Sequence, residues 1–209
     1  SPPPPDNLRA EILRESKDGD VTIRVVELFF GPQHRAKMTV ELLIPPAEGP
    51  LPVFMTQHCH RLWALIAVRR GYIGCAYAGS DSKDDTEDYA NIWYPDFDFT
   101  RLMRRAWGAS RVIDYLYTLE IVDKERIALT GHSRNGKQSL MAAAFDERIK
   151  AVIPSSGGTG AENPWRFTSE KYDTESITEI STVFPYWIHP RIRFFVGAEH
   201  KLPVDQNLL

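Results

Sequence analysis

Ser133 is the residue whose surroundings in this sequence best suit chemistry. It stands two positions after Gly131, between a short apolar run at 127–130 and a segment rich in helix formers at 137–145. The run predicts a strand buried on both faces, and the segment after it predicts a helix. A serine on a tight turn between two such elements presents its hydroxyl at the edge of a sheet, and a small residue two positions earlier lets the backbone pass close by. Ser133 is therefore a candidate nucleophile.

The spacing matches the nucleophile elbow of α/β-hydrolases, G-x-S-x-G, with one departure. The second glycine should stand at position 135, but Asn135 is there and Gly136 follows. An ordinary glycine turn in which Ser133 only caps a helix is the alternative. Arg134 and Lys137 favour the elbow, because cations in the first turn of a helix oppose its dipole and suit a site that binds an anion or oxyanion. The Arg134 N–H is then the natural oxyanion donor.

The segment Gly-His-Ser-Arg-Asn-Gly-Lys at 131–137 resembles the Gly-Cys-Ser-Arg-x-Gly-Lys signature of glucuronoyl esterases, carbohydrate esterase family 15. The segments 145–149 and 202–206 also resemble parts of that family. The resemblance covers most of the chain from about residue 100 onward. Two positions differ, since His132 replaces the cysteine and Gln138 stands where the family usually has glycine.

The resemblance implies a serine esterase that acts on a carbohydrate ester through an acyl-enzyme on Ser133. It also implies that Arg134 helps to hold the oxyanion and that Lys137 hydrogen-bonds sugar hydroxyls. A glucuronoyl ester of plant or algal polysaccharide is the favoured substrate, and an acetyl xylan esterase-type deacetylase is the close alternative. A carbohydrate-binding domain without catalysis is the alternative from another class. The plainer interpretation is that Arg134 and Lys137 are surface cations that balance the charge of an acidic stretch at 81–88.

A serine hydrolase also needs a base and an acid, and in this fold they follow the serine in the order acid, then histidine. Only His189 and His200 follow Ser133, and neither comes after a convincing last strand. The family often carries a glutamate 23 positions after the serine, where this chain has Ser156. We therefore expect either that the acid, the histidine and the last strands lie beyond Leu209, or that the domain has lost its triad.

Other polar residues are weaker candidates. His132 adjoins the serine, but its side chain would leave the turn in another direction, so we expect it to pack nearby. His58 and His60 follow the third predicted strand, where hydrolases place the oxyanion loop, and they fit the lining of a pocket better than a metal pair. The segment 191–197 fits a strand, which would make Glu199 a candidate acid, or a helical stretch, which the resemblance favours.

The order of predicted elements indicates an α/β-hydrolase-type, mostly parallel sheet with helices on both faces, without its C-terminal strands. Two hairpin strands lead into it. The predicted strands are 21–30, 36–44, 51–56, 72–78, 127–130 and 149–154, and the predicted helices are 62–70, 99–119 and 137–145. Residues 1–7 form a proline-rich tail that we expect to be solvated, and residues 8–209 form the domain, with a cap-like insertion at about 159–190.

Composition excludes several classes of protein. The 209 residues are 43% apolar and 25% charged with a net charge of −3, which argues against nucleic-acid binding. No apolar run approaches the roughly 20 residues of a membrane span. The acidic stretch predicts a solvated loop rather than a metal site, and no cofactor is expected. Cys59 and Cys75 predict two buried free thiols rather than a disulfide. Ser1 replaces an initiator methionine, as after signal-peptide removal or trimming, and we expect a secreted or periplasmic protein.

Overall fold

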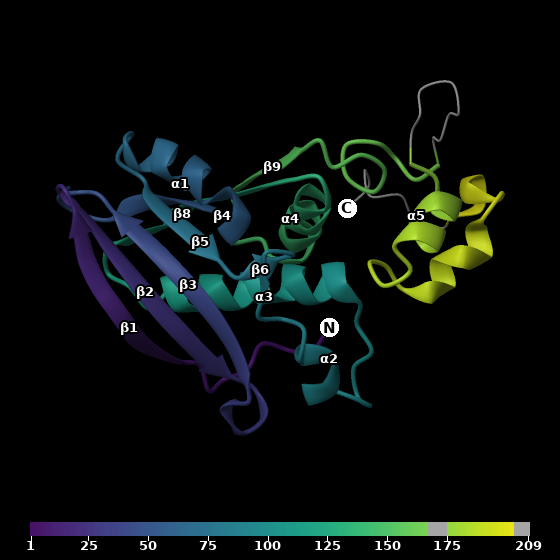
Figure 1. Cartoon of the computed structure of the whole chain (residues 1–209), viewed down its shortest axis with the longest axis horizontal. Helices are drawn as coiled ribbons and strands as arrows, with labels where there is room; N and C mark the ends of the chain where they lie inside the picture. The colour runs from purple at the N-terminus through teal and green to yellow at the C-terminus, as the bar shows by residue number, and fades with distance from the viewer. Residues whose placement is uncertain (167–174, 203–209) are drawn as a thin grey trace.

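A seven-stranded sheet of order β1-β2-β3-β5-β4-β8-β9 forms the centre of the protein (Figure 1). The structure is a computed structural model that describes residues 1–166 and 175–202. Its strands are β1 (Arg9–Asp18), β2 (Val21–Phe30), β3 (Ala36–Ile44), β4 (Leu51–Gln57), β5 (Ile73–Tyr77), β8 (Val122–His132) and β9 (Ala151–Ser155). The first three strands and β5 pair antiparallel, whereas β4, β5, β8 and β9 pair parallel.

Helices cover both faces of this sheet. Successive residues of a strand point to opposite faces, and both faces carry apolar side chains that the helices bury. Leu42 of β3 belongs to the main core, which packs against α3 (Arg101–Leu116) and α4 (Arg134–Phe145). The next residue, Leu43, packs against Ala64 and Val68 of α1 (Arg61–Val68) on the other face. The predicted α/β-hydrolase-type arrangement, with parallel central strands between two helical layers, is confirmed.

The connecting elements are short. They are η1 (Pro32–His34), η2 (His58–His60), β6 (Gly79–Ser80), β7 (Lys83–Asp84), α2 (Tyr89–Ile92), α5 (Ile177–Val183), η4 (Pro190–Phe195) and η5 (Glu199–Lys201). The favoured helical interpretation of 191–197 is confirmed, since η4 covers most of that segment, and the strand alternative is wrong. The described part of the cap-like segment docks through Trp187, which packs against Leu102 and Ile180. Residues 167–174 of the cap-like segment lie outside the described residues. So do residues 203–206, which belong to the stretch that resembles the family.

The first strand was missed by the sequence pattern. All ten residues of β1 are exposed, so the strand has no apolar face that would reveal it. It forms by backbone pairing with β2, and three antiparallel strands, rather than two, lead into the parallel sheet.

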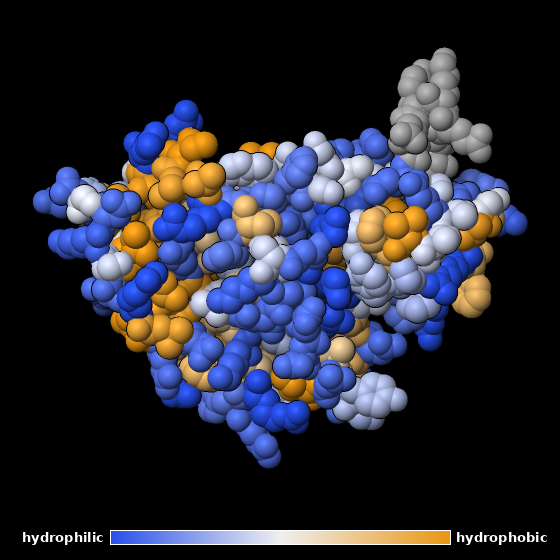
Figure 2. All heavy atoms as spheres, in the orientation of Figure 1, coloured by the Kyte–Doolittle hydropathy of each residue, from blue (hydrophilic) through white to orange (hydrophobic). Residues whose placement is uncertain are grey.

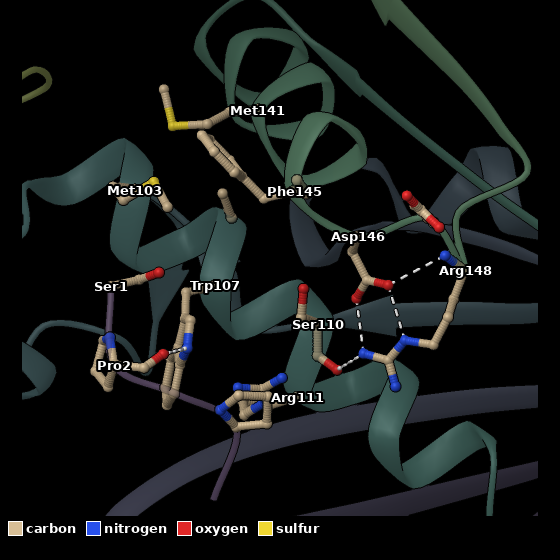
Figure 3. Close-up of a pocket in the computed structure, with 14 residues that line it drawn as sticks. Ser1, Pro2, Met103, Trp107, Ser110, Arg111, Met141, Phe145, Asp146 and Arg148 are labelled. Carbon is tan, nitrogen blue, oxygen red and sulfur yellow. Dashed lines mark hydrogen bonds and ion pairs between the residues drawn. The ribbon is translucent and has the colours of Figure 1, made fainter. Parts of the chain in front are cut away.

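The prediction of a solvated N-terminal tail is wrong at two points. Pro2 is buried, and its carbonyl oxygen accepts a hydrogen bond of 2.8 Å from the indole N–H of Trp107 (Figure 3). Asn7 brackets Gly31, because its Nδ2 donates to the Gly31 oxygen at 2.8 Å and its Oδ1 accepts from the Gly31 nitrogen at 2.9 Å. The tail is a strap that runs back along the domain.

The two cysteines are free, as predicted, but only one is buried. Cys75 lies in β5, and its burial, together with the charge of Glu41, raises the pKa of its thiol. Cys59 is exposed in η2, which corrects the prediction that both thiols are buried. Within residues 1–166 and 175–202, no helix is long and apolar enough to cross a membrane. Figure 2 shows a mostly hydrophilic face with apolar surface near α1, where Leu62 and Ile66 are exposed.

The strap makes a testable contribution to stability. We expect Asn7→Ala to lower the free energy of unfolding by roughly 2 kcal/mol, because each of its two hydrogen bonds to Gly31 contributes about 1 kcal/mol. Asp6→Ala is the matched control, since Asp6 is an exposed neighbour. Denaturant unfolding of the two variants measures the difference. Equal stabilities would show that the Asn7 side chain contributes nothing to stability.

Candidate active site

Ser133 lies on the turn between β8 and α4 with φ 56° and ψ −128°. This left-handed conformation is costly for a residue with a side chain, and such strain is concentrated at functional sites. The Ser133 nitrogen donates to the Ser155 oxygen at 2.8 Å, and the Ser133 oxygen accepts from the nitrogens of Gly136 at 2.8 Å and Lys137 at 3.1 Å. The Ser133 hydroxyl makes no capping hydrogen bond, so the alternative of a mere cap is not supported.

Two glycines make the turn sterically feasible. A Cβ atom at Gly131 would lie within 2.6 Å of both the Asn135 carbonyl carbon and Gln57 Oε1. A Cβ atom at Gly136 would lie 3.1 Å from the Gly131 oxygen and 3.3 Å from the Ser155 nitrogen. The second small residue of the elbow therefore works one position later than in the common pattern. Asn135 is tolerated because its buried side chain turns away toward η2.

The loop after β4 lies against the start of α4, where an oxyanion loop is expected. Asn135 Nδ2 is 3.3 Å from both Cys59 Sγ and His60 Nε2. The His60 ring stacks on Trp63, with centroids 4.6 Å apart, and meets His132 edge-on at 6.2 Å. Burial first, and then the charge of His132, lower the pKa of His60, which favours a neutral ring. His132 packs beside the turn, as expected.

Arg134 is held between an acid and two aromatic rings. Its Nη1 donates to Asp81 Oδ2, and its Cζ lies 5.0 Å from the Trp187 ring centroid and 5.6 Å from that of Phe184. Asp81 also accepts a hydrogen bond of 2.7 Å from Arg105. The plainer interpretation of Arg134 is thus right about its acidic partner, although the guanidinium also faces the aromatic rings.

Lys137 is buried, with 3% of its side chain exposed. Its Nζ donates to the Thr159 oxygen and to Glu175 Oε2, both at 2.6 Å. Burial lowers the pKa of Lys137, and the hydrogen bond and charge of Glu175 partly oppose that shift. A surface-cation role is therefore wrong for Lys137. Sequence reasoning missed Glu175, because it comes 38 residues later and no periodic pattern links it to the elbow.

The acidic stretch at 81–88 is partly solvated, as predicted, since Asp81, Glu87 and Asp88 are exposed, but two of its other acids also brace the fold. Asp84 is 5% exposed at its side chain and pairs with Arg105, whose side chain is 1% exposed. Asp85 Oδ2 accepts a hydrogen bond of 2.7 Å from the Thr39 nitrogen. In the parts of the chain that the structure describes, no group of three or more histidine, cysteine or acidic side chains is arranged to hold a metal ion.

A catalytic base is not brought to Ser133 by the described residues. Among 1–166 and 175–202, no hydrogen bond joins its hydroxyl to a histidine. His189 lies 3.8 Å from Asp98, and His200 lies in η5. The Glu199 carboxylate accepts from the Gly197 nitrogen at 3.2 Å, so it caps a local turn.

Position 156, where the resemblance expects an acid, belongs to a strained turn. Ser156 has φ 49°, and Gly157 follows it. The Gly157 nitrogen donates to Glu162 Oε1 at 2.9 Å, so a carboxylate reaches this turn from six positions further along the chain. The acid is therefore not at its expected place.

Two cavities flank α4, and neither is lined by Ser133. One of about 430 Å³ lies between α3, α4 and the N-terminal strap, with Trp107, Ser110 and Arg111 on one side and Asp146 and Arg148 on the other (Figure 3). The other, of about 680 Å³, is lined mainly by apolar residues of α4 and by the segment 188–192. Lys137 is the elbow residue that reaches this second cavity.

The strand, strained serine turn and helix, set between parallel strands, define the class of protein as an α/β-hydrolase. A family model described as "Glucuronyl esterase, fungi" matches residues 32–209. The chain therefore belongs to the glucuronyl esterase family, which confirms the resemblance seen at 131–137. A curated relative, 4-O-methyl-glucuronoyl methylesterase 1 of Phanerochaete chrysosporium, is 27% identical over 222 residues, which include all of this chain and 46% of the relative.

Solved structures show the same fold. A glucuronoyl esterase from Solibacter usitatus has a TM-score of 0.81 and 23% identity, over 98% of this chain and 65% of that one. A serine-to-alanine variant of the Sporotrichum thermophile glucuronoyl esterase, solved in complex with methyl 4-O-methyl-β-D-glucopyranuronate, has a TM-score of 0.74 and 21% identity, over 99% and 57%. This chain thus spans about half of its curated relative and less than two thirds of these solved chains.

The elbow depends on the absence of a side chain at Gly131. We expect Gly131→Ala to lower the free energy of unfolding by roughly 3 kcal/mol or more, because overpacking against backbone cannot be relieved by rotating a side chain. Gly49→Ala is the control. It has a positive φ but nothing within 4 Å of its Cβ position, so it carries only the backbone cost of about 1 kcal/mol. Denaturant unfolding measures both. A cost at Gly131 no larger than that at Gly49 would contradict the close approach.

Proposed function

We propose that this chain carries the nucleophile of a serine carboxylic-ester hydrolase that acts on carbohydrate esters, with a glucuronoyl ester of plant or algal polysaccharide as the favoured substrate. The observation that carries the proposal is the strained Ser133 turn, with Arg134 and Lys137 in the first turn of the helix behind it. Membership of the glucuronyl esterase family supports it. So do the names of curated relatives, which are 4-O-methyl-glucuronoyl methylesterases.

In the proposed reaction, Ser133 Oγ attacks the ester carbonyl and a base takes its proton. The negative charge that develops on the carbonyl oxygen is stabilised by the N–H of Arg134 at the start of α4 and by its guanidinium. The alcohol leaves with a proton, and the glucuronoyl group stays bound to Ser133 as an ester. Water then releases the acid and restores the serine.

Lys137 and Glu175 are the proposed contacts for sugar hydroxyls. A buried ammonium that already donates to a carboxylate and a carbonyl is rigid, and a rigid donor loses little entropy when a hydroxyl approaches. Glu175, one third exposed at its side chain, offers carboxylate oxygens to a hydroxyl donor. Since such polysaccharides lie outside cells, we infer a secreted or periplasmic protein.

The base and the acid are proposed to come from further strands and loops of a longer polypeptide. The edge strand β9 supports this, because in the described sheet it pairs only with β8. Ile153, in the middle of β9, is 61% exposed. An apolar strand edge of this kind invites pairing with another strand.

Hydrolysis by the polypeptide at its natural length tests the function. We expect it to cleave a methyl glucuronate ester and to react with a fluorophosphonate probe, and we expect Ser133→Ala to abolish both. Ser155→Ala, at the end of the neighbouring strand, is the matched control and should still be labelled. A preference of tenfold or more for an aryl acetate would favour the acetyl xylan esterase alternative. No labelling of the folded wild type would favour the non-catalytic alternative.

The open edge predicts how residues 1–209 behave alone. We expect this fragment to be poorly soluble and inactive, because among residues 1–166 and 175–202 β9 pairs only with β8 and no base is hydrogen-bonded to Ser133. Ile153→Lys should raise the solubility of the fragment but lower the stability of the longer polypeptide, where the same position would be covered. Size-exclusion chromatography and denaturant unfolding measure the two effects. A monodisperse, esterase-active wild-type fragment would overturn this proposal and make His189 and His200 the candidate bases.

A further inference from the structure

We propose that Asp81 is a positioning residue that holds the Arg134 guanidinium beside the nucleophile. The inference rests on the proposed function of Ser133 and Arg134, and it adds to the site a residue from the acidic stretch, far from the elbow in sequence.

One carboxylate joins two arginines at this place. Asp81 Oδ1 accepts a hydrogen bond of 2.7 Å from Arg105 Nη2, and its Oδ2 accepts from Arg134 Nη1. The Arg105 side chain is 1% exposed and also donates through Nε to Asp84 Oδ2 at 2.8 Å. Arg105 belongs to α3, and its burial and its two carboxylate partners hold its guanidinium in place. Asp81 is thereby anchored to the core on one side and contacts the site on the other.

The opposite side of the Arg134 guanidinium is closed by aromatic rings. Phe184 and Trp187 stack with centroids 3.8 Å apart, and Arg134 lies over both. Trp187 is 2% exposed, and its carbonyl oxygen accepts from the Leu102 nitrogen at 3.2 Å, which docks it on the first turn of α3. Both sides of the guanidinium are therefore tied to the same helix.

A fixed guanidinium is what an oxyanion contact requires. A free arginine side chain samples many rotamers, and only a preorganised donor stabilises charge without reorganising during the reaction. Asp81 is ionised at neutral pH, since burial raises its pKa but the hydrogen bond and charge of Arg105 and the charge of Arg134 outweigh burial and lower it. Because Asp81 is shared between two cations, it orients Arg134 without neutralising the pair.

A double-mutant cycle in the polypeptide at its natural length separates positioning from plain stabilisation of the fold. We expect Arg134→Ala to lower kcat by about 100-fold, in the range seen when an oxyanion donor is removed. Asp81→Asn should lower kcat by roughly tenfold with little change in KM, because it acts only through Arg134. The double variant should be no slower than Arg134→Ala alone. Asp81→Glu keeps the charge and should recover part of the lost kcat.

Asp88→Asn is the matched control, because it removes the same charge from an exposed position of the same acidic stretch. A full additional tenfold loss in the double variant would show that Asp81 acts independently of Arg134, and Asp81→Asn activity equal to that of Asp88→Asn would also overturn the proposal.

A readout without catalysis keeps the two proposals apart. In NMR spectra of arginine-labelled wild type, the Arg134 Nη protons should exchange slowly with solvent, and Asp81→Asn should make that exchange fast. Fast exchange already in the wild type overturns the positioning role. A wild type with slow exchange but no ester hydrolysis contradicts the proposed function and leaves the positioning contact intact.

Discussion

The close approach of α4 to β8 is the constraint on which the rest of the site depends. At Gly131 there is no room for a Cβ atom, because the carbonyl of Asn135 and the side chain of Gln57 occupy that space. This contact forces the chain to reverse within one residue, which leaves Ser133 in a left-handed conformation. The same reversal directs the N-terminus of α4 toward Ser133. The close approach at Gly131 therefore positions both the nucleophile and the helix N-terminus.

Buried charge explains how distant segments are assembled around that turn. A charge taken out of water must be paired, or its desolvation is left uncompensated. Lys137 forms an ion pair with Glu175 of the segment 159–190, and Arg105 forms ion pairs with Asp84 and Asp81 of the acidic stretch. These pairs tie Glu175 and the acidic stretch to α4 and α3, respectively. Polar pairing, rather than apolar packing alone, thus sets the geometry around the elbow.

The two edge strands of the sheet differ in length and exposure. At one edge, β1 is an exposed, charged strand, a composition that discourages pairing with other chains. At the other edge, β9 is short and carries exposed Ile153. The second edge lies beside the elbow, because Ser155 of β9 accepts the Ser133 N–H. Elements added at that edge would therefore be close enough to supply groups to the nucleophile, which agrees with the greater length of the relatives.

Local patterns in the sequence determined much of the fold and the centre of the site. The apolar runs of the buried strands, the glycine two positions before Ser133 and the helix formers after it are local signals, and the structure has those elements at those places. The heptapeptide at 131–137 was enough to indicate the family. The sequence pattern did not predict strand β1, because a fully exposed strand has no hydrophobic period. It did not predict the N-terminal strap either, because the strap contacts residues far along the chain.

Only the tertiary structure decided which charges meet. Nothing in the spacing of Asp81, Arg105 and Arg134 shows that one carboxylate bridges two guanidiniums, because Asp81 lies in a turn and the two arginines lie in different helices. The pairing of Lys137 with Glu175 has the same origin. Side-chain partners across such separations are chosen by burial and by the path of the intervening chain, and neither is encoded in a short window of sequence.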